Sequence, residues 1–592
     1  MHSAETKYEK ASLLGLALAL AFSFTANGQS PSQSPQGETP TPSATGTITG
    51  RVLSENGQPL PNATVFLQGS IPLFQQQTTT TDNEGNFQVS GLDQVLYGAS
   101  AIAPAYVAPA RDPDSPPNYY RVGDSVTLRL VKGGVITGTV SSTSGEPVVQ
   151  VIVQCVMVRD ANGQPSRTAM YQPQRTTDDR GVYRIYGLLP GTYVVSAGGR
   201  SAFNMGPYAN DAPTYAPSST RDTAAEIVVR AGEETSSVDI RYRAEPGHIV
   251  SGVVVGPTDP NSYSQFNVNL TQVSNGVPMG TSYSFQSPNS KGFSFYGLAD
   301  GDYELVTQSS IGVGELAASE PRRVSVRGAN VTGIELTVKP LGAVGGRVAL
   351  ALSDAVECKN KHQPLFSETL ILARRSEKGL PKDAARFPPL FGGQGTPNKS
   401  GDFLIRNLAP GAYGLNAQFF AKYWYLKSIS RESSPRPPVV GRAAPADRQA
   451  DVALNGIALK FGERITGVTV TLAGGAASFR GTVQTAGGNV PPKLYVHLVP
   501  AEKENADDVL RFFAGEVNSD GTFALNNLPP GRYWVLARVV SENEAKSVAK
   551  LRSPDEVEMR VQMRRAAETA NTEIEFKPCQ NVVDYPLAFK SR

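Results

Sequence analysis

Histidine is the first residue type to test, because it is a common zinc ligand and a frequent acid–base catalyst. The chain has four histidines, and His2 lies in a predicted signal segment, which leaves His248, His362 and His497. None belongs to a His-Glu-x-x-His motif, and His362 has no acidic residue at the spacing of a His-x-x-Glu pair. His497 alternates with apolar neighbours along a predicted strand, which favours the face opposite the core. We therefore predict a surface histidine at position 497 and no metal site.

Two glycine-rich segments imitate nucleotide-binding loops. Residues 392–400 (GGQGTPNKS) lack the Gly-Lys-Ser step of a phosphate loop, and residues 342–346 (GAVGG) begin a predicted strand instead of a helix. The sequence also has no Gly-x-Ser-x-Gly nucleophile elbow. Because no set of catalytic residues is assembled, we predict that the protein is not an enzyme and needs no cofactor.

Acidic turns are the remaining candidates for metal chemistry. Asp82 and Asp178 each open a short turn that ends in glycine, with further oxygen ligands beside them. Calcium takes about six to eight oxygen ligands, and one turn supplies few. The corresponding turns at Asn398 and Asn518 carry an amide and keep the same spacing. These segments are therefore predicted to be plain β-turns, in which the side chain accepts bonds from backbone N–H groups.

Length and composition indicate several small β domains. The chain has 592 residues, which is too many for one hydrophobic core. Its 57 glycines and 44 prolines suit short strands joined by many turns. The formal net charge is +2 with no long basic run, so nucleic-acid binding is not expected.

The N-terminus has the pattern of an export signal. Two lysines precede an apolar stretch at residues 11–24, and residues 26–28 (ANG) form a small-x-small cleavage site before Gln29. The apolar stretch is short for a membrane span, although nearby glutamates leave an uncleaved anchor as an alternative. We predict a signal peptide over residues 1–28 and a disordered Ser/Pro/Gln linker over residues 29–45. The mature chain would then be secreted, periplasmic or at the cell surface, without membrane insertion.

Three cysteines are too few for a disulfide framework across several domains. Cys155 lies in an apolar strand-like run and is predicted to be buried. Cys358 and Cys579 are candidates for a bond between neighbouring domains in an oxidising compartment. Their pairing depends on a distance that the sequence leaves open.

Two short sequence motifs, which we call phrases, recur in the same order along the chain. The first is a short strand with glycine between apolar residues, which indicates a backbone that another strand approaches closely. Its copies are residues 48–52 (ITGRV), 136–140 (ITGTV), 250–254 (VSGVV), 344–348 (VGGRV) and 479–483 (FRGTV).

The second phrase is a turn, a strand with an aromatic residue, a second turn and a tyrosine. Its turn glycines are expected at positive φ, and the third copy is one residue shorter between the glycine and the aromatic residue. These glycines are Gly85, Gly181, Gly292, Gly401 and Gly521. The tyrosines are expected to pack in the core with their hydroxyls bonded to backbone. They are Tyr97, Tyr193, Tyr303, Tyr413 and Tyr533.

These phrases, with alternating strands between them, predict an all-β fold of five tandem antiparallel Greek-key β-sandwiches of prealbumin-like or immunoglobulin-like type. We number the repeats 1 to 5. They are predicted over residues 46–132, 133–245, 246–340, 341–474 and 475–592.

The pairing of the two phrases resembles the carboxypeptidase regulatory-like domain, and the resemblance extends over nearly everything after residue 45. It implies a transthyretin-like sandwich related to collagen-adhesin B-type repeats and to starch-binding-like folds. In metallocarboxypeptidases this domain accompanies the catalytic domain and is not itself catalytic, so the resemblance implies no peptidase activity. Residues 423–429 (YWYLKSI) resemble a version that is common in large secreted bacterial proteins.

One aromatic segment stands outside this pattern. Along residues 419–425, strand alternation would place Tyr423 and Tyr425 on one face and Trp424 on the other, which leaves a large ring exposed whichever face is buried. Exposed indole and phenol rings suit sugar stacking, so these three residues are the candidate ligand-binding site. Burial of both faces beneath the insertion at residues 430–451 is the alternative.

Two classes of function follow. The first is a secreted, non-catalytic binding or scaffolding array, for which polysaccharide is the first ligand class to test and a cell-surface or extracellular protein is another partner. The second is a structural spacer or cell-surface assembly component without a ligand. An accessory subunit of a separately encoded peptidase or glycan-degrading enzyme is a further alternative.

Overall fold

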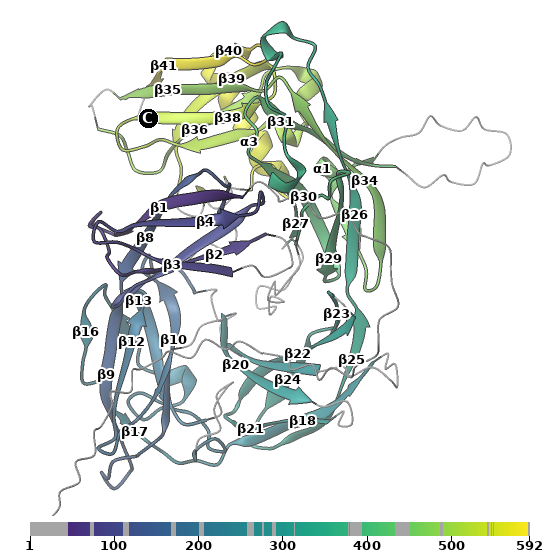
Figure 1. Ribbon diagram of the computed structural model, residues 1–592. Coiled ribbons are helices and arrows are strands. Elements are labelled where there is room, and N and C mark those ends of the chain that lie inside the picture. The colour runs from purple at the N-terminus through teal and green to yellow at the C-terminus, as the bar shows by residue number, and fades with distance from the viewer. Residues whose placement is uncertain are drawn as a thin grey trace, which may run out of the picture. The chain divides into compact units, whose positions relative to one another are not determined.

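The computed structural model of the chain (Figure 1) describes residues 45–589 with internal gaps. The residues outside this description are 1–44, 71–75, 110–117, 167–172, 200–206, 257–265, 275–276, 287–291, 313, 377, 379–392, 433–449, 486–488, 542–543, 546–547, 549 and 590–592. The predicted signal peptide and almost the whole predicted linker therefore lie outside the described residues.

Segments rich in β-branched and aromatic residues form the strands, as their preference for a pleated, half-buried surface requires. Repeat 1 has two sheets, ordered β4-β1-β8-β6 and β3-β2-β5-β7. Their strands are β1 (Gly46–Ser54), β2 (Thr64–Gly69), β3 (Gln76–Thr80), β4 (Asn86–Leu92), β5 (Tyr97–Ile102), β6 (Tyr106–Val107), β7 (Tyr119–Tyr120) and β8 (Ser125–Lys132).

Repeats 2 and 3 follow the same plan with different edges. Repeat 2 has β12-β9-β16 facing β11-β10-β13-β14, while the strands of repeat 3 are linked through β23 and β25 into one sheet. The strands of repeat 2 are β9 (Gly134–Ser141), β10 (Ile152–Asp160), β11 (Gln174–Thr176), β12 (Val182–Leu188), β13 (Gly191–Ala197), β14 (Thr214–Tyr215), β15 (Ile227–Val229), β16 (Glu234–Thr235) and β17 (Ile240–Arg241). Those of repeat 3 are β18 (His248–Val255), β19 (Phe266–Ser274), β20 (Val277–Gln286), β21 (Gly292–Leu298), β22 (Gly301–Gly312), β23 (Glu315–Ser319), β24 (Arg322–Val326) and β25 (Val331–Pro340).

Repeats 4 and 5 also contain two sheets each. The orders are β29-β26-β34-β31-β32 with β28-β27-β30-β33, and β38-β35-β41 with β37-β36-β39-β40. The strands of repeat 4 are β26 (Gly342–Ala351), β27 (Thr369–Arg375), β28 (Gln394–Gly395), β29 (Asp402–Leu408), β30 (Gly411–Phe419), β31 (Trp424–Arg431), β32 (Ala450–Asp451), β33 (Ile457–Leu459) and β34 (Arg464–Gly474), with helix α1 (Val452–Asn455). Those of repeat 5 are β35 (Ala477–Thr485), β36 (Leu494–Pro500), β37 (Phe513–Glu516), β38 (Thr522–Leu528), β39 (Gly531–Val539), β40 (Glu573–Phe576) and β41 (Asn581–Phe589).

The predicted all-β sandwich fold is confirmed, with one difference in each repeat. The glycine-containing first strand lies between two partners, as β26 does between β29 and β34. It pairs antiparallel with the strand of the second phrase and parallel with the last strand of the repeat. The sandwiches are therefore not purely antiparallel.

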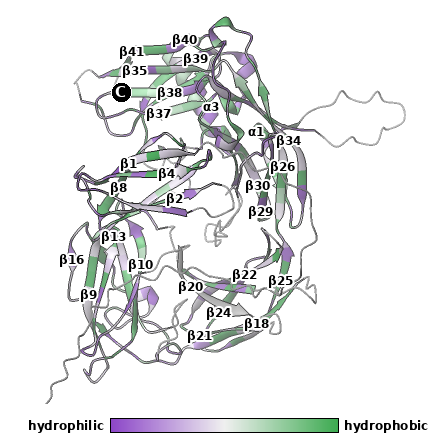
Figure 2. Ribbon diagram, viewed as in Figure 1, coloured by the Kyte–Doolittle hydropathy of each residue, from purple (hydrophilic) through white to green (hydrophobic). Residues whose placement is uncertain are grey.

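Hydrophobic cores form between the sheets, and Figure 2 shows apolar residues recurring along the strands. Each of the five predicted segments contains a core cluster that includes a fully buried residue of its first strand. These residues are Ile48, Ile136, Val250, Val344 and Phe479. The fourth cluster also takes in Val509 and Leu510, which come from the fifth segment. Repeats 4 and 5 thus share apolar contacts across their predicted boundary.

The prediction of a turn glycine at position 292 in the third copy is wrong. Gly85, Gly181, Gly401 and Gly521 have positive φ, whereas Gly292 is the first residue of β21 and pairs with Val253. In repeat 1 the residue at this place in the register is Asn86, one position after the turn glycine. The one-residue deletion in copy three therefore moves its glycine from the turn into the strand.

A helix that the sequence reading did not anticipate covers part of repeat 5. Helix α3 (Val557–Ala570) buries Met563 and Ala567, and half-buried Met559 joins them against the sheet that contains β36 and β39. The spacing of these three residues is that of one helix face. Residues 557–563 (VEMRVQM) also alternate apolar and polar residues as a strand does, and Val557 and Val561 are exposed, so periodicity alone did not identify the helix. Within the part of the chain that the structure describes, no helix is long and apolar enough to cross a membrane.

Candidate functional site

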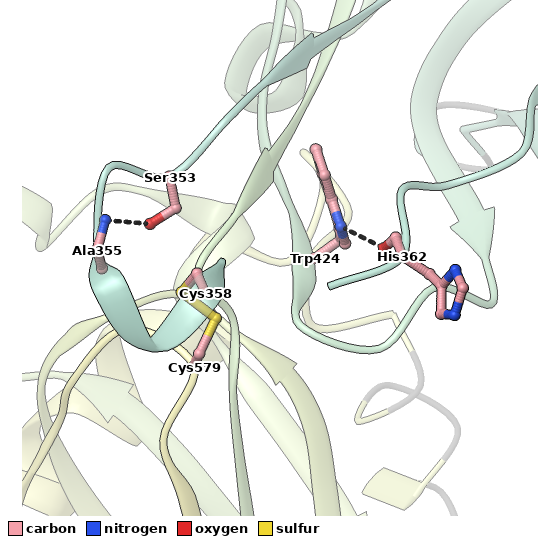
Figure 3. The surroundings of a disulfide bond; sticks show 6 residues. All are labelled: Ser353, Ala355, Cys358, His362, Trp424 and Cys579. Carbon is pink, nitrogen blue, oxygen red and sulfur yellow. Dashed lines mark hydrogen bonds between the residues drawn. A yellow bond between two sulfur atoms is a disulfide. The ribbon is translucent and has the colours of Figure 1, made fainter. Parts of the chain in front are cut away.

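Trp424 does not lie on the surface. It begins β31, points into the core of repeat 4 and is 3% exposed (Figure 3). Its indole Nε1–H donates to the carbonyl oxygen of His362 at 2.9 Å, so the one polar atom of the ring is satisfied inside the protein. The prediction that a large exposed ring offers a sugar platform at Trp424 is therefore wrong.

The two neighbouring tyrosines do not form a common face. Tyr423 lies in the turn before β31 at a φ of 65°, so strand alternation does not apply to it. The ammonium of Lys361 lies over its ring, 4.5 Å from the ring centroid. Tyr425 is half-buried, and desolvation raises the pKa of its hydroxyl. The predicted three-residue site is thus split between the core, a turn and a partly covered strand.

The same segment instead joins repeats 4 and 5. The carbonyl oxygen of Tyr423 accepts the N–H groups of Gly475 and Ala476, at 2.8 and 2.9 Å. The side-chain amide of Asn527, from repeat 5, donates to the carbonyl oxygens of Ala421 at 3.0 Å and Trp424 at 2.7 Å. Residues 420–423, which we call the aromatic turn, are therefore held by backbone and side-chain donors of the following repeat.

A disulfide closes the same junction (Figure 3). Cys358 ends the 3-10 helix η2 (Val356–Cys358), and Cys579 lies in the turn between β40 and β41. Their Cα atoms are 5.6 Å apart, and the bond links residues 221 positions apart in the sequence. The N–H of Cys579 donates to the carbonyl oxygen of Gly475 at 3.0 Å, which ties this turn to the connection between the repeats. The pairing that the sequence left open is present.

Asn527 belongs to a series that the sequence reading missed. The residue before the last leucine of each second-phrase strand has positive φ, between 57° and 77°, and the ladder with the first strand shifts register there. This series, which we call the bulge residues, consists of Gly91, Gly187, Gly297, Asn407 and Asn527. Glycine and asparagine are the residues that adopt this conformation at least cost, so the recurring Gly-Leu and Asn-Leu pairs were the available signal.

Four bulge residues face the preceding repeat. A Cβ at Gly187 would touch Val107, and one at Gly297 would overlap the carbonyl oxygen of Ala209. Asn407 goes further, because its Oδ1 accepts the N–H of Leu316 at 2.8 Å and its Nδ2 donates to the carbonyl of Gly314 at 3.1 Å. Repeats 2 and 3 thus use a small residue for close approach, and repeats 4 and 5 use an amide that bonds to the preceding loop.

The five repeat tyrosines are structural in their surroundings. All are at most 5% exposed. The hydroxyls of Tyr193, Tyr303, Tyr413 and Tyr533 donate to the carbonyl oxygen four residues earlier, at 2.7 to 3.0 Å. Desolvation raises the pKa of all five, that of Tyr413 to about 12. Each fastens the turn that precedes its strand.

The acidic turns use their oxygens within the turn. Oδ1 of Asp82 accepts the N–H groups of Glu84 and Asn86, and the bond from Asn86 holds the pKa of this carboxyl below its usual range. Asn398 makes the same two bonds without a charge, to Ser400 and Asp402. Among the described residues, no group of three or more His, Cys, Asp or Glu side chains could hold a metal ion.

His497 contradicts its prediction as a surface residue. It lies on the face of β36 opposite the core, as alternation requires, but it is fully buried. Leu551 and helix α3, which lie between β39 and β40 in the sequence, cover that face. Strand periodicity gave the correct face, and the unanticipated helix explains the error in exposure.

Comparison with known proteins now identifies one module. Residues 47–114 match the carboxypeptidase regulatory-like domain. These residues span most of repeat 1, from its glycine-containing first strand through the first tyrosine of the series.

The curated relatives are much longer proteins. The mouse BOS complex subunit NOMO1 is 30% identical over 153 residues, which are 25% of this chain and 11% of that protein. Human NOMO3 is 29% identical over the same length and shares. The chain thus spans about a tenth of the length of these relatives.

The solved structures that match include a collagen binding protein and a pilin, both at low sequence identity. Two B repeat units of the collagen binding protein of Staphylococcus aureus are 10% identical, covering 72% of this chain and 99% of that one, with a TM-score of 0.12. The minor pilin GBS52 of Streptococcus agalactiae is 14% identical, covering 33% of this chain and 94% of that one, with a TM-score of 0.18.

Proposed function

We propose that the protein is an exported, non-catalytic scaffold in which β-sandwich repeats are held in a fixed order. The observation that carries the proposal is the Cys358–Cys579 disulfide, which links repeat 4 to repeat 5. Disulfides of this kind persist in oxidising compartments and are rare in the cytosol. The bond therefore supports export, in agreement with the signal pattern of residues 1–28.

The contacts at the junctions support a scaffold over a sugar-binding array. Asn407 and Asn527 bond to backbone groups of the preceding repeat, and the aromatic turn at Tyr423 takes part in the last junction. The indole of Trp424, which was the proposed sugar platform, lies in the core instead. The aromatic segment outside the repeat pattern thus contributes backbone carbonyls to the junction between repeats 4 and 5. Under this proposal the partner is a cell-surface or extracellular protein.

The test is the chemical state of the natural protein. We expect the protein recovered from the producing cells to begin at Gln29 and to be found outside the cytoplasm. Alkylation without reduction should leave Cys358 and Cys579 unmodified, and peptide mapping should recover them as one linked pair. Cys155 provides an internal control, because it is buried and burial raises its thiol pKa to about 12, so it should react only after unfolding.

Three results would count against the proposal. A chain that retains Met1 in the cytosol, with both thiols open to alkylation, would contradict export. Specific retention of the protein on a glycan array, lost on mutation of surface residues without loss of folding, would restore carbohydrate binding as the function. Co-purification with a peptidase or glycan-degrading enzyme would favour the accessory-subunit alternative.

A further inference from the structure

A histidine without a hydrogen-bond partner lies under the cover of repeat 5. His497 is fully buried, and neither ring nitrogen bonds to any residue that the structure describes. It stands between Ala514 of β37 and Leu536 of β39, both of which belong to the apolar cluster on this face. An imidazole in such a place loses its hydration without replacement, which strongly favours the neutral ring over the charged one.

The cover over this face consists of residues 550–570, which we call the cap. Its apolar contacts are made by Leu551, Met563 and Ala567, which pack with Val499 and Phe512. Within the cap, Arg560 of α3 donates to the carbonyl of Leu551 at 2.9 Å. Arg564 fastens the cap to the sheet, because it donates to the carbonyl of Pro500 at 2.6 Å and its guanidinium lies over the ring of Trp534. The cap is therefore held by contacts to the same sheet that carries His497.

The charges on this face would not stabilise an imidazolium. On β39, Arg538 shares the face of His497, and its guanidinium is ion-paired with Glu544. On β37, Glu516 accepts the hydroxyl of Tyr495, the neighbour of His497 on β36. From the cap, Arg552 donates to the carbonyl of Phe512 at 3.0 Å, and Arg560 and Arg564 bond as described above. The two carboxylates are thus engaged elsewhere, while the guanidinium of Arg538 disfavours a charged ring.

We propose that His497 makes the cap of repeat 5 an acid-sensitive switch, which is closed over the sheet while the imidazole is neutral and opens when the imidazole takes up a proton. Opening returns the ring to water and exposes the apolar face of β36 and β39. This inference concerns repeat 5 alone and does not depend on the scaffold function.

The direction of the pH dependence follows from linkage. Burial, followed by the Arg538 charge, lowers the pKa of His497 to about 3 in the closed state, against 6.5 for the unperturbed residue. The open state therefore binds more protons between these values, so stability of the closed cap is fully present above about pH 6.5 and is lost as the pH falls toward 3. From pH 7.0 to 4.5 the opening constant should rise roughly 80-fold if the open-state pKa is about 6.5.

The experiment is hydrogen exchange of the full oxidised chain at pH 7.0 and 4.5, followed in peptides from α3 and corrected for intrinsic exchange rates. We expect the exchange protection of α3 in the wild type to fall roughly 80-fold between pH 7.0 and 4.5. The protection of β-strand peptides from repeats 1 to 3 should change far less. In the variant His497→Leu the protection of α3 should change by less than about fivefold between the two pH values, because no buried imidazole is left to titrate. The matched control is His362→Leu. The His362 side chain is exposed, so this variant should keep the wild-type loss of α3 protection at pH 4.5.

Two further arms separate His497 from its surroundings. The variant Glu544→Gln should retain the acid response, because the imidazole and not the Glu544 carboxylate takes up the proton. If His497→Leu does not fold, titration of wild type labelled with carbon-13 at the histidine rings gives the answer, because the buried ring should not titrate between pH 8 and 5. A His497 signal that titrates near pH 6.5 in the closed protein, or an unchanged α3 response in His497→Leu, would overturn the proposal.

Discussion

At the scale of single residues, the repeat is held by positions where a side chain cannot be added. The glycine of each first strand lies against the last strand of its repeat, or in repeat 2 against the link between β16 and β17, and a Cβ there would overlap a backbone carbonyl oxygen. These glycines are Gly50, Gly138, Gly252, Gly346 and Gly481. The expectation of a closely approached backbone therefore describes a contact that all five copies make.

Repeat 4 offers a matched test, because Gly345 and Gly346 are adjacent. A Cβ on Gly346 would overlap the carbonyl oxygen of Val468, whereas one on Gly345 would meet Leu404 at an ordinary 3.4 Å. We expect Gly346→Ala to lower the free energy of opening of β26 by about 1–3 kcal/mol. Gly345→Ala should be neutral or slightly stabilising, since it restricts the unfolded chain. Hydrogen exchange of β26 measures both, and equal effects would mean that the close approach is not what requires glycine.

Trp424 shows what residue patterns could not predict. Alternation assigned it correctly to the face opposite Tyr425, but the choice of buried face depends on a turn at residues 420–423 that interrupts the aromatic run. The indole is accommodated because the carbonyl of His362, 62 positions away, accepts its N–H. A partner so distant in sequence is set by tertiary packing and leaves no local signal.

At the scale of elements, the bulge at the end of each second-phrase strand has two separable roles. Its positive φ shapes the strand, and in repeats 4 and 5 its amide bonds to the preceding repeat. The first role requires only glycine or asparagine. The second requires the side chain.

Variants at Asn527 separate these roles. Asn527→Gly keeps the backbone conformation and removes the two bonds to Ala421 and Trp424, so we expect it to weaken the junction by about 1–2 kcal/mol. Asn527→Ala should cost about 1 kcal/mol more, because the left-handed backbone conformation is unfavourable for alanine. The neighbouring Asn526→Ala, at an exposed site, is the control. The measurement is exchange protection of the aromatic turn and β38, and a glycine variant as costly as the alanine one would assign the whole effect to the side chain.

Elements were predicted from the sequence with uneven success for physical reasons. The five-fold repetition made the sandwich strands recognisable, since turn glycines, strand alternation and the tyrosine recur together at Gly401, Phe403 and Tyr413 and in the other copies. Helix α3 occurs once and gains nothing from repetition. Its absence from the prediction also produced the error at His497, because exposure depends on what covers a face as well as on the face itself.

At the scale of the whole molecule, the last two repeats are coupled covalently as well as by packing. Val509 and Leu510 of repeat 5 enter the core cluster of repeat 4, and the disulfide spans 221 residues from η2 to the last turn. A cross-link over so long a loop restricts the unfolded chain most strongly, by about 5 kcal/mol in the chain-entropy description. Repeats 4 and 5 are therefore expected to unfold together while the bond is intact.

The double variant Cys358→Ser/Cys579→Ser tests this coupling. We expect the native sheets to persist, because both cores are otherwise complete, and the unfolding of repeats 4 and 5 to shift to lower denaturant concentration. The shift should correspond to at most about 5 kcal/mol, since a disulfide acts mainly on the unfolded state. Wild type treated with a reductant should reproduce the variant, and repeats 1 to 3, which lie outside the closed loop, should keep their own midpoints. Exchange-detected denaturant titration of the full chain resolves the repeats separately. An unchanged midpoint for repeats 4 and 5 would mean that they unfold independently and that the bond restrains their arrangement without stabilising either core.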